Sequence, residues 1–394
     1  MSTDVKTSPC VKSHTSSGSA ISPPKLRLLR FDDYEKTTQL LSTNSFTALP
    51  YEDWRGIWVD NPLWSRMGRD FPIGWVLETT AEEIVGIFGS VPILYKFRGD
   101  DLVSAVGRTW FVRAPYRGFA LQLLDEYFSQ PANLFINTTV NPDASAPFNQ
   151  LSSRIPLGDW QVLSYWVTSY REFAEKALRK RGVPFSRPLA SSAGAALRFR
   201  DAVYNKRFPR LPGAFAIDNV ERFDSRFDIF WKELLRHGHD KLVAQRDSKT
   251  LSWHFAIPMR RGRLWIFTAS RNQQLRGYCT LTQQDHMFEL PNGDTKAFRG
   301  MRLADYQSIE ADVDLLPGLL TAALARCTVE HVDFLENLGR GVPKMRVFDE
   351  CAPYSSKLDN WRFVYRASDP ALEEELCQPK CWDPSAFDGD SSFE

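Results

Sequence analysis

The feature that most constrains the fold is a change of pattern between residues 74 and 137. Short segments rich in β-branched and aromatic residues come first, and the polar turns between them predict an antiparallel meander. The last of these segments, residues 105–112, leads into a turn that contains Pro115 and Gly118, and apolar residues then recur at helical spacing over residues 120–128. Another apolar segment, residues 134–137, follows. This order predicts a mixed sheet with a helix on one face, in an α+β or mixed α/β fold.

The same kinds of pattern recur along the rest of the chain. Strands are predicted over residues 74–78, 84–88, 92–97, 105–112, 134–137, 264–268, 276–281, 298–303 and 331–336. Helices are predicted over residues 31–42, 120–128, 144–154, 222–235 and 315–326. A turn at residues 291–293 is typical of a hairpin. The second series of elements repeats the order of the first, which suggests an internal duplication.

A chain of 394 residues exceeds what one hydrophobic core usually serves, so two folded domains are expected. The Ser- and Thr-rich start has too little apolar surface to fold, and the acidic end is expected to be loosely attached. The predicted organisation is a disordered tail at 1–24, a first domain at 25–180, a linker at 181–211, a second domain at 212–370 and a C-terminal tail at 371–394.

The charge balance argues against whole classes of partner. Lysine and arginine number 49 and aspartate and glutamate 48, without a block of like charge, so neither nucleic acid nor a membrane surface is an expected partner. The start of the chain lacks the basic and apolar regions of a secretory signal, and no apolar run is long enough to cross a bilayer. A cytoplasmic protein is therefore expected, and homodimer formation stays open.

The cysteine and histidine patterns do not indicate a metal site. Six cysteines are scattered without a CxxC pair, and the close pair Cys377 and Cys381 has no histidine nearby. The sequence His237-Gly-His239 after a predicted helix is more typical of a polar turn than of a ligand pair. No metal cofactor is expected.

The turn at residues 113–118 has the features of an anion site. A strand, a tight turn and the start of a helix direct backbone N–H groups and the positive end of a helix dipole toward one point. Gly118 allows close approach, and Arg113 and Arg117 are placed to bind phosphate oxygens. The alternative is an ordinary strand-to-helix turn with solvated arginines.

The order of elements and the V-x-x-P-x-R-G turn at residues 112–118 resemble the coenzyme A-binding core of the GNAT acyltransferases over about residues 25–180. The resemblance implies that loop amides from Arg117 to Gln122 bind the CoA pyrophosphate, although Ala120 and Gln122 are bulkier than the family pattern. It also implies that the acyl-pantetheine arm enters between the strands at 105–112 and 134–137. The implied cofactor-binding residues are Phe111, Val112, Arg113, Arg117, Gly118, Phe119, Ala120, Asn137 and Asn141. Asn137 and Asn141 serve equally well as caps of the next helix.

The catalytic residues stay unassigned. The implied reaction is attack of an amine on a thioester, which needs a proton acceptor and a proton donor. The strand at 105–112 lacks the carboxylate that many family members carry there, and Phe148 stands where a tyrosine is often found. The acids and bases that remain as weak candidates are Glu78, Asp101, Asp125, Tyr116, Tyr165 and Tyr170.

The second domain resembles the second unit of the doubled GNAT arrangement of FemAB-like transferases. Its corresponding turn, residues 305–314, is acidic and would repel a pyrophosphate. The resemblance therefore implies two tandem GNAT-like domains, of which only the first binds acetyl-CoA or another acyl-CoA. The implied function is N-acyl transfer, such as acetyl transfer, to a small-molecule amine, for example an amino sugar or a cell-envelope or polysaccharide precursor. A catalytically inactive binding protein and a FemAB-type aminoacyl transferase are the alternatives.

Overall fold

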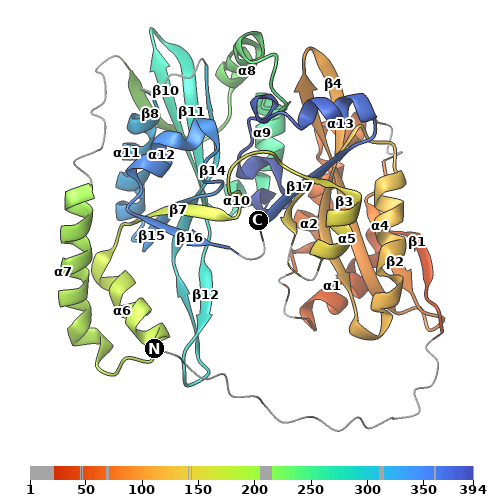
Figure 1. Ribbon diagram of the computed structural model, residues 1–394, viewed down its shortest axis with the longest axis horizontal. Helices are drawn as coiled ribbons and strands as arrows, with labels where there is room; N and C mark the ends of the chain where they lie inside the picture. The colour runs from red at the N-terminus through yellow and green to blue at the C-terminus, as the bar shows by residue number, and fades with distance from the viewer. Residues whose placement is uncertain are drawn as a thin grey trace.

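The computed structural model describes residues 22–44, 46, 48–67, 71–140, 142, 144–204, 215–309, 315–358 and 361–393. Two large sheets lie side by side, and the chain ends between them (Figure 1). The first sheet has the spatial order β1 (Lys25–Leu28), β2 (Gly74–Glu78), β3 (Ile84–Phe97), β4 (Asp100–Val112), β5 (Leu134–Val140), β17 (Arg362–Ala367) and β6 (Ser153–Arg154), and β9 (Val243–Ala244) pairs with β3.

The second sheet has the spatial order β16 (Tyr354–Lys357), β7 (Val162–Val167), β15 (Phe334–Asn337), β14 (Gly300–Ser308), β11 (Gln274–Gln283), β10 (Leu264–Arg271) and β8 (Ala216–Val220). A separate hairpin consists of β12 (His286–Glu289) and β13 (Thr295–Phe298). In both sheets neighbouring strands are mostly antiparallel, and the parallel pairs are β4 with β5 and β14 with β15. The predicted fold class of two mixed, mostly antiparallel sheets flanked by helices is confirmed.

Helices cover both sheets. Those of the first half are α1 (Tyr34–Ser42), α2 (Tyr51–Val59), α3 (Pro62–Arg66), α4 (Ala120–Ser129) and α5 (Ser145–Leu151). The others are α6 (Tyr170–Lys180), α7 (Ser186–Tyr204), α8 (Ser225–His237), α9 (Ser248–His254), α10 (Ala256–Arg260), α11 (Leu315–Val329), α12 (Arg346–Cys351) and α13 (Pro370–Leu376). α4 follows β4, and α11 follows β14, so the two halves repeat one plan around their parallel strand pairs.

Sheet membership departs from the expected boundary at residue 180. β7 precedes that boundary but pairs with β15 and β16 in the second sheet. In return β17, from near the end of the chain, joins β5 in the first sheet. Neither strand was predicted from the sequence, and the partner of a strand is chosen by packing between distant segments. The two halves are therefore connected by an exchange of strands.

The segment expected as a linker is largely helical. α7 spans 19 residues of the predicted 181–211 and lies beside α6 (Figure 1). Its alanine, leucine and arginine residues are good helix formers, which outweighs the prolines and serines that indicated a connector. A side chain at Gly194 would place its Cβ 3.1 Å from the backbone of Arg171, so the close contact of the two helices depends on that glycine.

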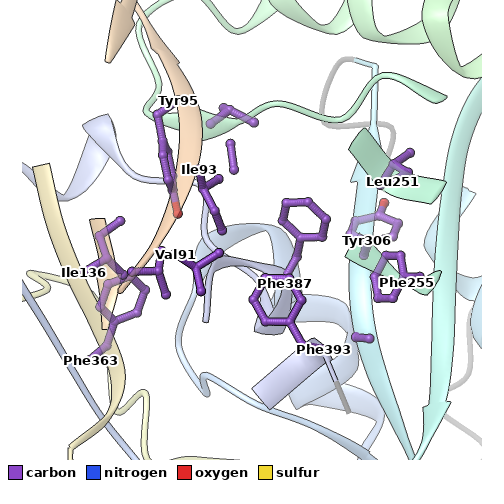
Figure 2. Close-up of a cluster of buried hydrophobic side chains, with 14 of the residues drawn as sticks. Val91, Ile93, Tyr95, Ile136, Leu251, Phe255, Tyr306, Phe363, Phe387 and Phe393 are labelled. Atoms are coloured by element: carbon purple, nitrogen blue, oxygen red, sulfur yellow. The ribbon is translucent and has the colours of Figure 1, made fainter. Parts of the chain in front are cut away.

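The C-terminal segment, residues 382–393, is packed rather than loosely attached. Phe387 and Phe393 are buried between the two sheets, with Val91, Ile93 and Tyr95 of β3 on one side and Phe255 and Tyr306 on the other (Figure 2). The two sheets consequently share one continuous hydrophobic core instead of the two separate cores that were expected. Although the segment is acidic, its few aromatic side chains pack among apolar residues of both sheets and hold it in place.

A buried ionic cluster ties the segment to both halves. Arg246 is fully buried, and its Nε donates to Asp305 Oδ2 of β14 at 2.9 Å while Nη1 donates to the Ala244 carbonyl at 2.7 Å. Its Nη2 lies 3.6 Å from Asp388 Oδ2 in the C-terminal segment, and Tyr95 of β3 donates to the other oxygen of Asp388. Burial opposes ionisation of Asp305, but the charge of Arg246 outweighs it and lowers the pKa of that carboxyl. Asp305 was expected in an acidic turn and lies instead in a strand.

Candidate functional site

The parallel strands of the first sheet separate after three paired positions. Ser104, Ala105 and Val106 of β4 align with residues 134–136 of β5, and beyond Val106 the two strands diverge. β4 then continues beside β3, and β5 continues beside β17. We call this divergence the first fork. It creates unpaired strand edges inside the sheet, where a ligand can bond to backbone groups.

The root of the first fork is closed by side chains. Tyr127 of α4 donates its hydroxyl hydrogen to the Ala105 carbonyl at 2.7 Å and accepts from Asn137 Nδ2 at 3.1 Å. A Cβ at Gly107 would lie 1.9 Å from Asn137 Oδ1, so only glycine fits opposite that amide. Burial raises the pKa of Tyr127 well above its ordinary value, and the phenol therefore remains a hydrogen-bond donor. Asn137 thus lies at the fork, and its amide is used in closing it.

β4 carries a bulge just beyond the root. Thr109 and Trp110 together face Phe88 of β3, and Thr109 has a φ of 54°, which a β-branched residue rarely adopts. Such strain persists where the surrounding structure enforces it, often at functional sites. Trp110 packs on Phe88 and Phe148, and its indole N–H is buried without a hydrogen-bond partner among the described residues. The bulge therefore leaves a donor beside the fork.

The turn after β4 is wound as a 3-10 helix over Ala114–Phe119 and leads directly into α4. Arg117 and Gly118 are exposed, and a Cβ at Gly118 would meet nothing within 4 Å. Arg113 is paired with Glu83 at 2.6 Å, and the Ala120 N–H donates to the Arg117 carbonyl. Two of the expected phosphate-binding groups are thus engaged within the protein, while the space around Gly118 is open.

The remaining predicted cofactor residues lie on the same stretch of chain. Phe111 and Val112 are the last residues of β4, and their partners in β3 are Ile87 and Gly86. Phe119 precedes α4. Asn141 lies outside the described residues.

A cavity of about 250 Å³ adjoins the bulge between α1, α2 and the central strands. Arg108 and Thr109 of β4 line it, and so do aromatic side chains of the helical layer, Tyr34, Trp54 and Trp58. None of the described residues that line it carries a carboxylate. The cavity therefore suits a flat or ring-shaped molecule.

The C-terminal segment reaches the first fork. Thr139 of β5 donates to Asp390 Oδ1 at 3.0 Å, and Arg108 Nη1 donates to the Asp390 carbonyl at 3.3 Å. Two residues later, Ser392 Oγ lies 2.6 Å from Nε2 of the buried His254. Burial lowers the pKa of His254 to about 3, so the imidazole is neutral. A carboxylate from the end of the chain is thereby placed at the divergence of β4 and β5.

The predicted acids and bases lie in different places. Glu78, at the end of β2, is paired with Arg27 at 2.8 Å, which lowers its pKa to about 2. Asp101 lies near the start of β4, far along the strand from the bulge, and pairs with Lys96. Tyr165 belongs to β7 in the second sheet and stacks on Tyr354. Tyr116 alone lies in the turn before α4.

Sequence reasoning did not single out Thr109, Trp110, Tyr127 or Asp390. Threonine and tryptophan are ordinary strand residues, and Tyr127 occupied a core position of a helical pattern. Asp390 lies more than 250 residues from Thr139, its partner at the fork.

Neither a metal-ion site nor a membrane-spanning helix is found in the part of the chain that the structure describes. No group of three or more histidine, cysteine, aspartate or glutamate side chains is arranged to hold a metal ion. In the same residues, no helix combines the length and apolarity that a membrane span requires.

Comparison with known proteins places the fold. No protein-family model matches the chain, and no curated protein matches it significantly. Saccharomyces cerevisiae N-myristoyltransferase, solved with bound myristoyl-CoA, is similar in structure with a TM-score of 0.53 at 12% identity, over 90% of this chain and 81% of that one. An Enterococcus faecalis V583 protein described as a probable N-acyltransferase gives 0.51 at 11% identity, over 88% and 73%. The chain therefore has the two-domain GNAT fold that the sequence predicted.

Proposed function

We propose that this protein is an acyl-CoA-dependent N-acyltransferase whose reaction takes place at the first fork. The observation that carries the proposal is the divergence of β4 and β5 beside a strained bulge, with a helix start at the far end of β4. Divergent strands offer unpaired backbone groups to an extended amide-containing arm, and the helix start offers a positive end to phosphates.

In this arrangement the CoA pyrophosphate lies against the turn before α4. Arg117 is exposed there, and Gly118 leaves room for close approach of the phosphates. Arg113 is held by Glu83, so Arg117 is the residue that supplies a mobile cation. The affinity for CoA should accordingly depend on the charge of Arg117.

The acyl-pantetheine arm follows the open edge of β4 toward the bulge. The buried N–H of Trp110 has no partner among the described residues, and a carbonyl of the arm would satisfy it. The acyl group would then lie near Phe148 and Phe88, the aromatic neighbours of Trp110. Acetyl groups and longer chains are both compatible with this environment.

The acceptor amine enters from the aromatic cavity. The aromatic lining, with Tyr34 and the partly buried Trp54, suits a sugar or aromatic ring. The amine nitrogen attacks the thioester carbonyl, the C–N bond forms and the C–S bond breaks. Asp390 takes the proton that the nitrogen loses, and a proton from solvent converts the leaving thiolate into the thiol of CoA. The products are an amide and free CoA.

A catalytically inactive binding protein is the second candidate. It is favoured by the contact of Trp110 with Phe148, whose ring centroids lie 5.4 Å apart and which occupy space between β4 and α5. The Ala120 N–H, bonded within its own turn, also favours it. If these groups do not move, the acyl-pantetheine arm cannot enter.

Calorimetric titration with acetyl-CoA and myristoyl-CoA tests the proposal without the unknown acceptor. We expect binding at one site, weakened about tenfold or more by Arg117→Glu because a phosphate contact becomes repulsive. Arg187→Glu is the matched control, since the Arg187 side chain is 78% exposed on α7, and it should bind as the wild type does. Absence of binding in the wild-type protein would reject the acyl-CoA function.

A further inference from the structure

The second sheet has a fork of its own. β14 and β15 pair in parallel over Gly300–Arg302, and β14 then continues without β15 to Ser308. It carries a bulge at Ala304, where its register against β11 shifts. A cavity of about 450 Å³ lies beyond this second fork, and its walls include the last residues of β14, the start of α11 and the segment 343–350. Its size is that of an ordinary small-molecule site.

One buried polar group in this cavity has no partner. Gln307 of β14 is 1% exposed and lines the cavity, and its Nε2 makes no hydrogen bond among the described residues. An unsatisfied buried amide is costly, and native proteins seldom leave one without a reason. The missing partner must be a hydrogen-bond acceptor, since an amide nitrogen only donates.

A buried lysine lies in the same cavity. The side chain of Lys344 is 11% exposed, and its Nζ contacts the carbonyl and a carboxylate oxygen of Asp383, at 2.9 and 3.3 Å. Burial lowers the pKa of this amine, so an anion bound beside it would stabilise the charged form. The charged form has three N–H donors, and among the described residues these two contacts leave one for a ligand. Lys241, 3.9 Å from Asp383, adds a second positive charge. The acceptor end of a ligand is therefore favoured if it is anionic.

The rest of the wall is mainly apolar, with Leu234, Val243, Leu316 and Val347 among the lining residues. From these observations we propose that the second fork binds a small monocarboxylate with an apolar chain, whose carboxylate lies between Gln307 and Lys344. A phosphate ester is less suited because Asp383 also lines the cavity and would repel its greater charge, whereas the other acid of the lining, Glu350, is paired with Arg346. The site is independent of the proposed acyl-CoA site.

Titration of the full-length protein with decanoate tests the proposal, and decylammonium, which has the same chain and the opposite charge, is the matched ligand control. We expect saturable one-to-one binding of decanoate and at least tenfold weaker binding of decylammonium. Equal binding of both ligands would mean that the cavity is apolar and does not distinguish an anion from a cation. Binding of neither ligand would mean that the cavity holds only solvent. Either result would overturn the proposal.

Two variants locate the site. Gln307→Leu should weaken decanoate at least fivefold and at the same time raise the melting temperature of the ligand-free protein, because a buried amide without a partner is replaced by an apolar group. Val347→Trp, at a partly buried wall position, should fill the cavity and abolish binding while the protein stays folded. Unchanged affinity in both variants would place decanoate elsewhere and reject the site.

Arg117→Glu separates this inference from the proposed function. It should leave decanoate binding unchanged while it weakens acyl-CoA. Gln307→Leu should do the reverse. Loss of both ligands in either variant would indicate one shared site and would contradict the assignment to the second fork.

Discussion

The two forks of the molecule share a backbone plan and differ in what their side chains do with it. Each lies where a central strand leaves its parallel partner after three paired positions, and each central strand carries a bulge just beyond. At the first fork, Tyr127 and Asn137 close the root and the C-terminal segment covers the opening. At the second, a buried pair of Arg302 with Glu336 closes the root, and a cavity lies beyond.

The same strand plan therefore carries different side chains in the two halves. In both halves the diverging strands have backbone groups that can form hydrogen bonds with a ligand. Which ligand binds should therefore depend on the charged side chains and the free volume near each fork. Exposed arginine and glycine follow the first fork, whereas Asp305, near the second, is paired with Arg246 and contributes no free charge. We therefore expect the halves to bind different ligands and to depend on each other mainly through the C-terminal segment.

The largest effect on stability should come from removing the buried ionic contacts that connect the two halves. Arg246→Met leaves Asp305 and Asp388 buried without their cation, and unfolding in urea should show a loss of about 3–5 kcal/mol in the free energy of unfolding. Arg302→Met is the comparison, since its partner Glu336 lies within one sheet. A loss below about 1 kcal/mol for Arg246→Met would show that the ionic cluster does not hold the halves together.

A smaller effect is expected where the C-terminal segment supplies chemistry to the first fork. Asp390→Asn keeps an oxygen for Thr139 but removes the base, so it should lower kcat about a hundredfold with little change in KM. Release of CoA thiol in a panel of amines measures this once an acceptor is found. An unchanged kcat would remove Asp390 from the reaction and leave it as an anchor of the segment.

The effect that is smallest at neutral pH is that of His254, and it grows in acid. His254 has a folded pKa lowered by burial from 6.5 to about 3, so the unfolded chain binds a proton that the folded one does not. The stability contributed by the neutral imidazole is present above pH 6.5 and declines as pH falls from 6.5 toward 3, with a slope that approaches about 1.4 kcal/mol per pH unit. Unfolding measured across this range should show the slope in the wild type and a reduced slope in His254→Asn. Equal slopes would mean that other groups cause it.

Sequence reasoning succeeded where structure is local. β2 was predicted with its observed bounds, and α4 to within one residue. Both predictions depend on the pattern of apolar and polar residues that are near one another in the sequence. Residues 84–88 and 92–97 were expected as two strands, but β3 runs through both, since Gly89 and Ser90 are tolerated inside a paired strand. The exchange of β7 and β17 could not be predicted, because each pairs with strands brought near by the fold.

The residues of the candidate site also fall into two groups, those found from a local sequence pattern and those placed by tertiary contacts. Arg117, Gly118 and the helix after them were found from a local turn pattern, and Asn137 from the polar end of a strand. The bulge at Thr109 depends on how β3 and β4 align, and Asp390 depends on the docking of the chain end. Such features arise from tertiary contacts, which one sequence does not display.

Hydrogen–deuterium exchange with and without acetyl-CoA tests the central claim most directly, that the first fork alone takes acyl-CoA. We predict slower exchange in the end of β4, the turn over Ala114–Phe119 and the start of α4, with β14 and α11 unchanged. Protection confined to β14 and α11, or no protection anywhere, would contradict this assignment of the two forks.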